Sequence, residues 1–189
     1  VFDFNNDNAV EIVYRDEAYL YIINGKTGAV FTQATCRSRT ANDYPIVVDL
    51  DGDGATEICV TCATNDNCAN AFPIACGGTS SGTTATATID GPALDCLGGS
   101  TAPDVWYSIV GTGNAITASL CGSGYDTQLD VYTGACGALT NIGGCSDDFC
   151  GLQSQMTWTS TLGTTYLIRV HGFAGATGAY TLNVTCVIS

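Results

Sequence analysis

The chain has 189 residues, of which 18 are acidic and five are basic, so its formal net charge is −13. So few basic residues cannot form the patch that nucleic-acid phosphates require, and no segment approaches the ~20 consecutive apolar residues of a membrane span. Eleven cysteines, without the paired CxxC spacing of a zinc ribbon, predict disulfides formed in an oxidising compartment outside the cytosol.

Residues 1–62 hold almost all of the basic residues and several strand-like runs. The run from Tyr19 to Ile23 predicts a strand, and Asn24 to Gly28 predicts the turn that follows it. Two further strands are expected at residues 46–48 and 58–60. No segment of the chain has a convincing helical pattern.

Two acidic loops in this region, residues 3–11 and 49–57, align residue for residue. Each places oxygen-bearing side chains at positions one, three, five and nine, and the seventh residue can offer its carbonyl, which is a spacing suited to Ca²⁺. The sixth position must turn sharply, and it is Asn8 or Gly54. The alternative is that both loops are solvated acidic turns. The predicted ligands are Asp3, Asn5, Asp7, Ala9 and Glu11 in the first loop, and Asp49, Asp51, Asp53, Ala55 and Glu57 in the second.

The second loop, Asp49-Leu-Asp-Gly-Asp-Gly-Ala-Thr-Glu57, and its flanking strands resemble the FG-GAP or VCBS-type repeats of calcium-binding β-propellers. In that family the loop binds calcium between the strands of a blade. The two loops lie 46 residues apart, from Asp3 to Asp49, which is in the range of propeller-blade periods. One blade alone would expose unpaired strand edges, so the resemblance implies either further blades or a neighbouring chain that covers them.

From Asn65 onward the chain is rich in Gly, Thr, Ser and Ala, with short alternating runs that are typical of a β-sandwich or barrel. The Gly-rich segments 111–113, 122–124 and 143–144 are expected to be hairpin turns. The Thr-rich stretch 79–88 favours an edge strand over a flexible linker. The predicted strands are Thr83–Ile89, Val105–Val110, Ala115–Leu120, Gln128–Tyr132, Gln155–Ser160, Thr165–Val170 and Ala179–Val184.

Several single residues in this region carry chemical expectations. Val105, Tyr107 and Ile109 alternate to one face of their strand, whereas Leu167 and Arg169 are expected to face opposite ways. Trp106 and Trp158 are expected to pack in the core or at an edge, with a sugar-stacking surface as the alternative. His171 is the only histidine, and because no nucleophile signature accompanies it, a packed structural role is expected rather than a catalytic one.

Four aspartates form a candidate for a further cation site. Ser146 to Asp148 forms a tight loop, and Asp126 stands at the start of a strand, so their carboxylates could converge on one ion. The alternative is that they are solvated turn acids. The candidate residues are Asp126, Asp147 and Asp148, with Asp130 as a fourth.

The number of cysteines is odd, so at least one thiol is expected to be free or bonded to another chain. Sequence alone does not determine the connectivity, although proximity along the chain favours some pairs. A bond between Cys68 and Cys186 could tie the terminal strands together. The favoured pairs are Cys68–Cys186, Cys76–Cys96, Cys121–Cys136 and Cys145–Cys150.

Residues 66–186 resemble the bacterial pre-peptidase C-terminal domain and its cysteine-rich relatives. The segments that carry the resemblance are Ala102-Pro-Asp-Val-Trp-Tyr107, Tyr125-Asp-Thr-Gln-Leu-Asp-Val-Tyr132 and Tyr166-Leu-Ile-Arg-Val-His-Gly-Phe173. The resemblance implies a jelly-roll-like β-sandwich that serves secreted enzymes and surface proteins as a non-catalytic accessory module. The predicted fold is therefore all-β, with a propeller-blade-like calcium-binding segment at 1–62 followed by a disulfide-bonded, jelly-roll-like β-sandwich at 66–189.

Together these features predict a secreted or cell-surface protein that is not an enzyme. The leading hypothesis is a calcium-stabilised structural or adhesive module of the bacterial surface, which associates with identical chains and could form a filament. One alternative is the accessory C-terminal region of a secreted hydrolase. Another is a carbohydrate-binding module that holds a polysaccharide on Trp106 and Trp158. The chain starts at Val1 without a signal sequence, which predicts a processed or excised product.

Overall fold

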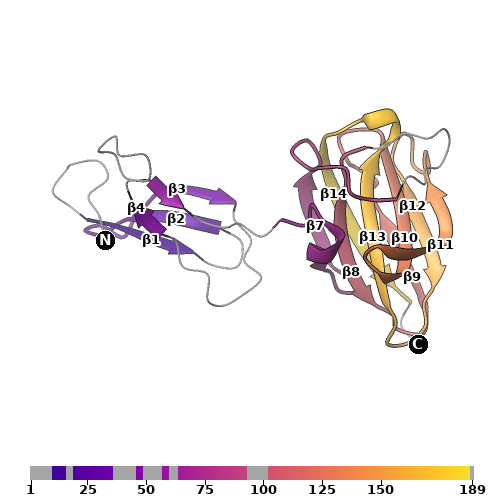
Figure 1. Cartoon of the computed structure of the whole chain (residues 1–189). Helices are drawn as coiled ribbons and strands as arrows, with labels where there is room; N and C mark the ends of the chain where they lie inside the picture. The colour runs from indigo at the N-terminus through magenta and orange to yellow at the C-terminus, as the bar shows by residue number, and fades with distance from the viewer. Residues whose placement is uncertain are drawn as a thin grey trace. The chain divides into compact units, whose positions relative to one another are not determined.

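The computed structural model describes residues 10–15, 19–35, 46–48, 57–59, 64–92 and 102–187 (Figure 1). It divides the chain into two compact units, residues 1–64 and 65–189. Within the described ranges the regular structure is β-strand, apart from two short 3-10 turns, η1 (Cys68–Asn70) and η2 (Phe173–Gly175). The expectation of an all-β chain is therefore confirmed. Nowhere in these ranges is there a helix with the length and hydropathy that crossing a membrane requires.

The first unit contains a three-stranded antiparallel sheet in the order β1-β2-β3. Its strands are β1 (Glu11–Arg15), β2 (Tyr19–Asn24) and β3 (Val30–Thr35). The Asn24 side chain closes the turn after β2, because its Oδ1 accepts hydrogen bonds from the backbone N–H groups of Lys26 (3.1 Å) and Thr27 (2.9 Å). The predicted strand and turn are thus confirmed.

A second pair of strands in this unit flanks the predicted second calcium loop. β4 (Ile46–Val48) and β5 (Glu57–Cys59) are antiparallel, with Val48 opposite Glu57. The two strands expected there are confirmed, although β5 begins one residue earlier than predicted. Among the described residues these strands and the three-stranded sheet do not join into the blade that the propeller resemblance implies.

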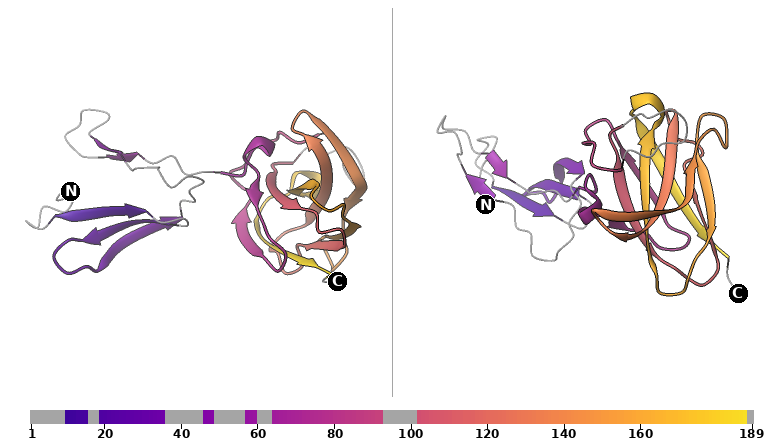
Figure 2. Two further views of the ribbon diagram at one scale, coloured as in Figure 1. Left: turned by 90° about the horizontal axis from the view of Figure 1, so that it is seen from below. Right: turned by 45° about the vertical axis from the view of Figure 1, so that its right-hand side comes forward.

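The second unit is a β-sandwich in which a five-stranded and a four-stranded sheet pack face to face (Figures 1 and 2). The five-stranded sheet has the order β11-β10-β13-β8-β6 and the four-stranded sheet the order β12-β9-β14-β7. All neighbouring strands are antiparallel except β6 and β8. The strands are β6 (Phe72–Pro73), β7 (Thr79–Thr83), β8 (Val105–Val110), β9 (Ala115–Ser119), β10 (Thr127–Ala135), β11 (Ala138–Ser146), β12 (Gln155–Thr159), β13 (Thr165–Gly172) and β14 (Ala179–Cys186).

Two predictions about these strands are wrong. The strand expected at Thr83–Ile89 lies instead at β7, because the chain turns after it, with Ala87 N–H donating to the Thr84 carbonyl at 3.1 Å. The turn expected at residues 143–144 lies inside β11, a strand that was not predicted. The ladder to β10 has a register shift there, and Asn141 Oδ1 accepts from the backbone of Gly143 and Gly144. The glycines therefore serve an irregular strand rather than a hairpin.

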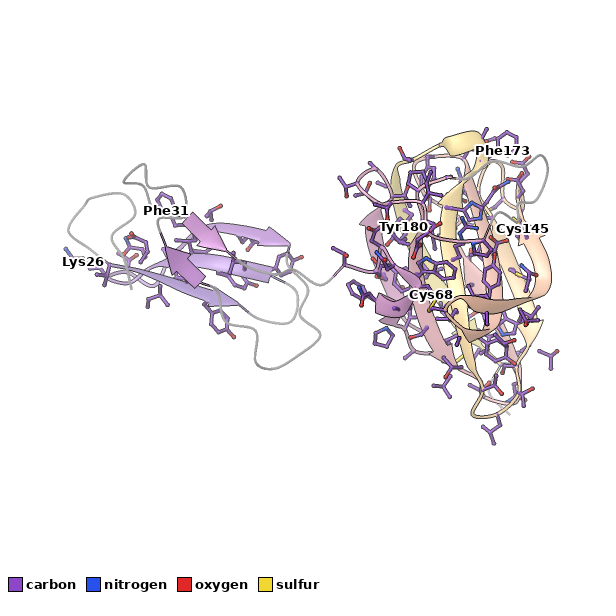
Figure 3. The ribbon with its side chains drawn as sticks, viewed as in Figure 1. Lys26, Phe31, Cys68, Cys145, Phe173 and Tyr180 are labelled. Atoms are coloured by element: carbon purple, nitrogen blue, oxygen red, sulfur yellow. A yellow bond between two sulfur atoms is a disulfide. The ribbon has the colours of Figure 1, made fainter. Side chains whose placement is uncertain are left out.

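The interior of the sandwich is built from alternate residues, since successive side chains of a strand point to opposite faces. Tyr180 of β14 is labelled in Figure 3. Its hydroxyl lies 2.7 Å from the Tyr107 hydroxyl of β8, in the other sheet. Trp158 of β12 and Tyr166 of β13 also meet across the sheets, with ring centroids 5.8 Å apart. The alternation expected along β8 is therefore confirmed.

The outer face of the five-stranded sheet is also covered, by the segment that precedes β6. This second cluster contains Cys68, Ala71, Trp106, Tyr132 and Leu167. Leu167 and Arg169 point to this same face because they are two residues apart in β13. The expectation that they point to opposite faces is wrong.

Disulfides join distant parts of the sandwich, and their pairing differs from the prediction. Cys76 meets Cys186 because β14 ends beside the residues that precede β7, where Gly77 N–H donates to the Val184 carbonyl at 2.8 Å. The Cys145 side chain is also disulfide-bonded. The described pairs are Cys68–Cys136, Cys76–Cys186 and Cys121–Cys150, so the predicted pairs Cys68–Cys186, Cys76–Cys96, Cys121–Cys136 and Cys145–Cys150 are wrong. These bonds indicate an oxidising compartment.

Candidate cation site

Three of the four candidate aspartates of the sandwich lie together at one end of the β10–β11 hairpin. Asp126 directly precedes β10, and Asp147 and Asp148 directly follow β11, whose last residue, Ser146, pairs with Leu129. One carboxylate oxygen from each of the three lies within 4.8 Å of the others. We call Asp126, Asp147 and Asp148 the acidic cluster. The fourth candidate, Asp130, lies elsewhere, in a buried network.

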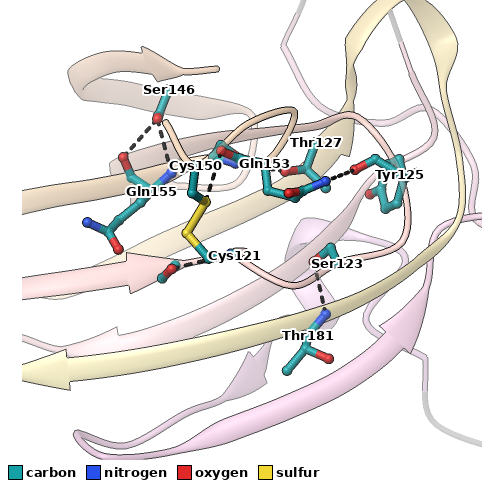
Figure 4. Close-up of a disulfide and its surroundings, with 11 residues drawn as sticks. Cys121, Ser123, Tyr125, Thr127, Ser146, Cys150, Gln153, Gln155 and Thr181 are labelled. Atoms are coloured by element: carbon teal, nitrogen blue, oxygen red, sulfur yellow. Dashed lines mark hydrogen bonds between the residues drawn. A yellow bond between two sulfur atoms is a disulfide. The ribbon is translucent and has the colours of Figure 1, made fainter. Parts of the chain in front are cut away.

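The loop that carries Asp147 and Asp148 is held in place by covalent and hydrogen bonds (Figure 4). The Cys121–Cys150 disulfide anchors it to the end of β9. Ser146 Oγ accepts from Gln155 N–H at 3.2 Å and donates to the Gln155 carbonyl at 2.8 Å. Asp148 has a φ of 49°, in the left-handed region that residues other than glycine rarely adopt. The disulfide and the hydrogen bonds of Ser146 therefore restrict the conformation of the loop.

The acidic cluster is electrostatically unfavourable by itself. Burial, and then the charges of Asp147 and Asp148, raise the pKa of Asp126 above its ordinary value. One carboxylate oxygen of Asp126 and one of Asp147 are buried without a hydrogen-bond partner. Gln128, which is 1% exposed, donates from Nε2 to Asp147 at 3.4 Å, while its own Oε1 is buried without a partner. Buried oxygens left in this state cost free energy, which a cation would relieve.

The donor set of the acidic cluster consists of oxygen atoms. Carboxylate and amide oxygens suit hard cations, and Ca²⁺ takes six to eight such ligands while Mg²⁺ takes six. Three carboxylates also supply the negative charge that a divalent ion offsets. If the Gln128 amide is turned over, its oxygen joins the set, because amide oxygen and nitrogen exchange places in such a flip. The residues present therefore fit a hard divalent cation.

A second group, Asp130, Cys145 and His171, also has ligand atoms close together. The Cys145 sulfur belongs to a disulfide and supplies no thiolate. His171 Nε2 and Asp130 Oδ2 form a hydrogen bond with each other at 2.9 Å. This group is therefore a structural one.

Asp130 and His171 belong to a buried ion-pair network on the outer face of the five-stranded sheet. Arg169 donates to Asp104 Oδ2 from Nη2 (2.7 Å) and Nε (3.0 Å), and its Nη1 lies 3.6 Å from Asp130 Oδ2. These four side chains are at most 1% exposed. His171 therefore contacts no solvent, and the expectation of a packed structural histidine is confirmed.

Trp106 is part of the same network. It is fully buried, and its indole Nε1 donates to Asp104 Oδ1 (2.8 Å) and Asp90 Oδ1 (2.9 Å). The Arg169 guanidinium lies 5.9 Å from its ring centroid. Core packing is thus confirmed for Trp106, and the sugar-stacking alternative fails because the ring has no exposed face.

The stability of the sandwich should depend on the protonation of Asp104. Burial, together with a hydrogen bond to Asp90, raises the pKa of Asp104 from 3.8 to about 7 against the opposing effect of Arg169. Between these pH values the folded protein holds a proton that the unfolded chain has released. We therefore expect the free energy of unfolding to fall by up to about 1.4 kcal/mol per pH unit as the pH rises from about 4 to 7.

Urea unfolding at several pH values measures this slope. The Asp104→Asn protein, whose amide does not titrate, should lack this contribution, although it is less stable at every pH. Equal slopes in the two proteins would show that Asp104 titrates alike in the folded and unfolded states.

The two predicted N-terminal calcium loops lie largely outside the described residues. This applies to Asp3, Asn5, Asp7, Ala9, Asp49, Asp51, Asp53 and Ala55. Glu11 begins β1 and is 1% exposed, and Glu57 begins β5. Calcium binding by these loops therefore stays a prediction.

Comparison with known proteins finds solved structures of low similarity. No protein-family model matches the chain, and no curated protein does. The pre-peptidase C-terminal domain of a collagenase from Bacillus anthracis is 14% identical with a TM-score of 0.40, covering 61% of this chain and 94% of its own. PliG from Aeromonas hydrophila, a periplasmic inhibitor of g-type lysozyme, is 16% identical with a TM-score of 0.40, covering 61% of this chain and 96% of its own. The resemblance of residues 1–62 to a propeller repeat stays a prediction.

Proposed function

We propose that the chain is a non-catalytic extracellular module whose β-sandwich is stabilised by Ca²⁺ bound at the acidic cluster. The observation that carries this proposal is the convergence of three carboxylates within 4.8 Å, with buried oxygens of Asp126 and Asp147 that have no hydrogen-bond partner. A divalent ion there would satisfy those oxygens and remove the repulsion among the carboxylates. The burial of the only histidine supports a role other than catalysis.

The same proposal extends to the N-terminal unit. The matching spacing of the two acidic loops supports a Ca²⁺ site in each, and the β4–β5 hairpin would hold the two ends of the second loop together. On the bacterial surface, several such ions would keep a chain of net charge −13 folded in a medium that contains calcium.

We further propose that copies of the chain associate into an adhesive assembly. The odd number of cysteines supports this, because at least one of the eleven has no partner within the chain. Light scattering in Ca²⁺, with and without a reductant, tests the association. A chain that stays monomeric in both conditions would rule it out.

Thermal unfolding in Ca²⁺ and in EGTA tests the cation site. We expect a higher midpoint in Ca²⁺, by an amount equivalent to about 2.7 kcal/mol at a hundred times the dissociation constant, because the ion binds the folded state. The double variant Asp126→Asn with Asp147→Asn should change rank relative to the natural protein between the two buffers. It should be more stable than the natural protein in EGTA, where repulsion is removed, and less stable in Ca²⁺, where the site is lost.

Two controls make this result specific. Asp66 accepts hydrogen bonds from the backbone N–H (2.6 Å) and the hydroxyl (3.0 Å) of Thr88. Asp66→Asn weakens these bonds, so it should lower the unfolding midpoint equally in both buffers. Asp51→Asn with Asp53→Asn removes two predicted ligands of the second loop and reports any calcium effect of the N-terminal unit. If the cluster variant keeps the full calcium effect, the acidic cluster is not a site.

A further inference from the structure

A groove of about 630 Å³ lies between β11 and β12, which are edge strands of the two sheets on one side of the sandwich. Ile142, Gly143 and Ser146 line it from β11, and residues 155–159 line it from β12. Asp147 of the acidic cluster stands among the lining residues as well. Apart from Asp147, the residues of the acidic cluster do not line this groove.

The hydrogen bonds around β12 show which of its backbone groups face the groove. The Ser154 carbonyl accepts a hydrogen bond from Leu120 N–H, and Ser160 N–H donates to the Asn114 carbonyl. The backbone N–H and C=O groups of the even-numbered residues of β12 therefore point toward β9. Gln155 N–H and C=O both bond to Ser146 Oγ, on the other side of the strand. Because an antiparallel ladder alternates, the N–H and C=O groups of residues 157 and 159 also face away from β9.

These groups form an open sheet edge. Thr157 and Thr159 have no backbone partner on that side among the described strands, since β12 is the terminal strand of its sheet. The spacing of two residues between them is the spacing with which an added antiparallel strand forms its paired hydrogen bonds. The edge is therefore complementary to an extended peptide.

The Trp158 side chain adds a second, independent feature. It lines the groove and is 7% exposed, and its indole Nε1 is buried without a hydrogen-bond partner. Tyr166 packs against its ring but offers the nitrogen no bond. A buried donor without a partner costs free energy, so an acceptor placed in the groove would recover it.

Charge restricts the occupant. Residues 65–189 contain eight aspartates and one arginine, Arg169, and that arginine is 1% exposed within the network. The described surface of this unit therefore carries acidic side chains and no lysine or arginine. At this groove a second copy of unit 65–189 would be repelled, so the association of copies proposed above does not use this groove. A positively charged segment would be attracted, most strongly at the Asp147 end.

We propose that the groove binds an extended, positively charged segment of a partner protein, which adds a strand to β12. Its backbone pairs with Thr157 and Thr159. A side chain that points inward beside Trp158 accepts the indole hydrogen bond, and a basic side chain lies toward Asp147.

The test uses the full chain and an eight-residue synthetic peptide that alternates valine with threonine and glutamine and has lysine at both ends. We expect binding in titration calorimetry, and protection of the Thr157 and Thr159 amides from hydrogen exchange when the peptide is added. Binding should occur in EGTA and be weaker in Ca²⁺, because a bound ion would reduce the negative charge at Asp147. Peptide binding measured in EGTA therefore tests the groove separately from the calcium site.

Three variants locate the binding mode. Thr157→Pro removes the outward N–H, a change that an edge strand tolerates, and should weaken binding at least tenfold. Thr157→Val keeps that N–H while losing the same hydroxyl, and should bind as the natural protein does. Trp158→Phe keeps a ring but loses the indole donor, and should weaken binding about fivefold.

Three outcomes would overturn the proposal. The first is binding that Thr157→Pro leaves unchanged. The second is equal binding of the same peptide with glutamate in place of both lysines. The third is a dimer that forms without peptide and is lost in the Thr157→Pro variant, which would make a second copy the occupant.

Discussion

Replacement of Arg169 by methionine should lower the free energy of unfolding by about 3–5 kcal/mol. Arg169 is the cation that faces two buried carboxylates, with Nη2 2.7 Å from Asp104 and Nη1 3.6 Å from Asp130. Without it, both carboxylates must either ionise unpaired in the interior or bind protons. Its Nη1 also donates to the Pro92 carbonyl at 2.9 Å, and that bond would be lost.

The pH dependence of this loss identifies its cause. Since the pKa of Asp104 is already raised to about 7, a proton can replace the missing charge more easily at pH 5 than at pH 8. We therefore expect a larger loss at pH 8, measured by urea unfolding at both values. Lys26→Met, at an exposed turn in the other unit, is the matched control and should change stability by less than about 0.5 kcal/mol. An equal loss at both pH values would point to lost packing rather than lost charge.

Removal of the Cys76–Cys186 disulfide by double replacement with alanine should cost about 4–5 kcal/mol. This bond closes 110 residues of the chain, and the entropy that a crosslink removes from the unfolded state grows with the length it closes. The Cys121–Cys150 bond closes 29 residues, so its removal should cost about 3–4 kcal/mol. Denaturant unfolding of the two double variants, in Ca²⁺ and in EGTA, measures both losses.

The two disulfide variants should also differ in their response to calcium. Cys121–Cys150 anchors the loop of the acidic cluster, so its loss should reduce the stabilisation by Ca²⁺ as well as the stability itself. Loss of Cys76–Cys186 should leave the calcium effect unchanged, because that bond lies at β14 and the start of β7. A calcium effect of the same size in both variants would mean that the loop is positioned without its disulfide.

Local pattern was sufficient for much of the sandwich. Val105–Val110 was predicted with its observed bounds because alternation, β-branched residues and flanking polar turns all agree there. β11 was missed because its glycines at 143 and 144 suggest a turn, although in the sheet they occupy an irregular stretch held by Asn141. Which role such glycines take depends on the neighbouring strand, which local sequence does not reveal.

The two candidate sites differ in the same way. Asp126, Asp147 and Asp148 were candidates because Ser146 to Asp148 has the pattern of a tight loop and Asp126 that of a strand start, although the β10–β11 hairpin that brings them together was not predicted. The groove at Trp158 had no such signal. It exists because β11 and β12 end their respective sheets on the same side of the sandwich, and strand order is decided by long-range pairing.

The sequence by itself determined the all-β class, the oxidising environment, the acidic loops and the packed histidine. Alternation and acidic spacing are visible within a few consecutive residues, and the cysteine content is visible in the composition. Only the tertiary structure decided the disulfide partners, the buried pairing of Arg169 with Asp104 and Asp130, and the open edge of β12. Each of these joins residues far apart along the chain, and the physical reason is that strand order and sheet packing, rather than distance in sequence, bring them together.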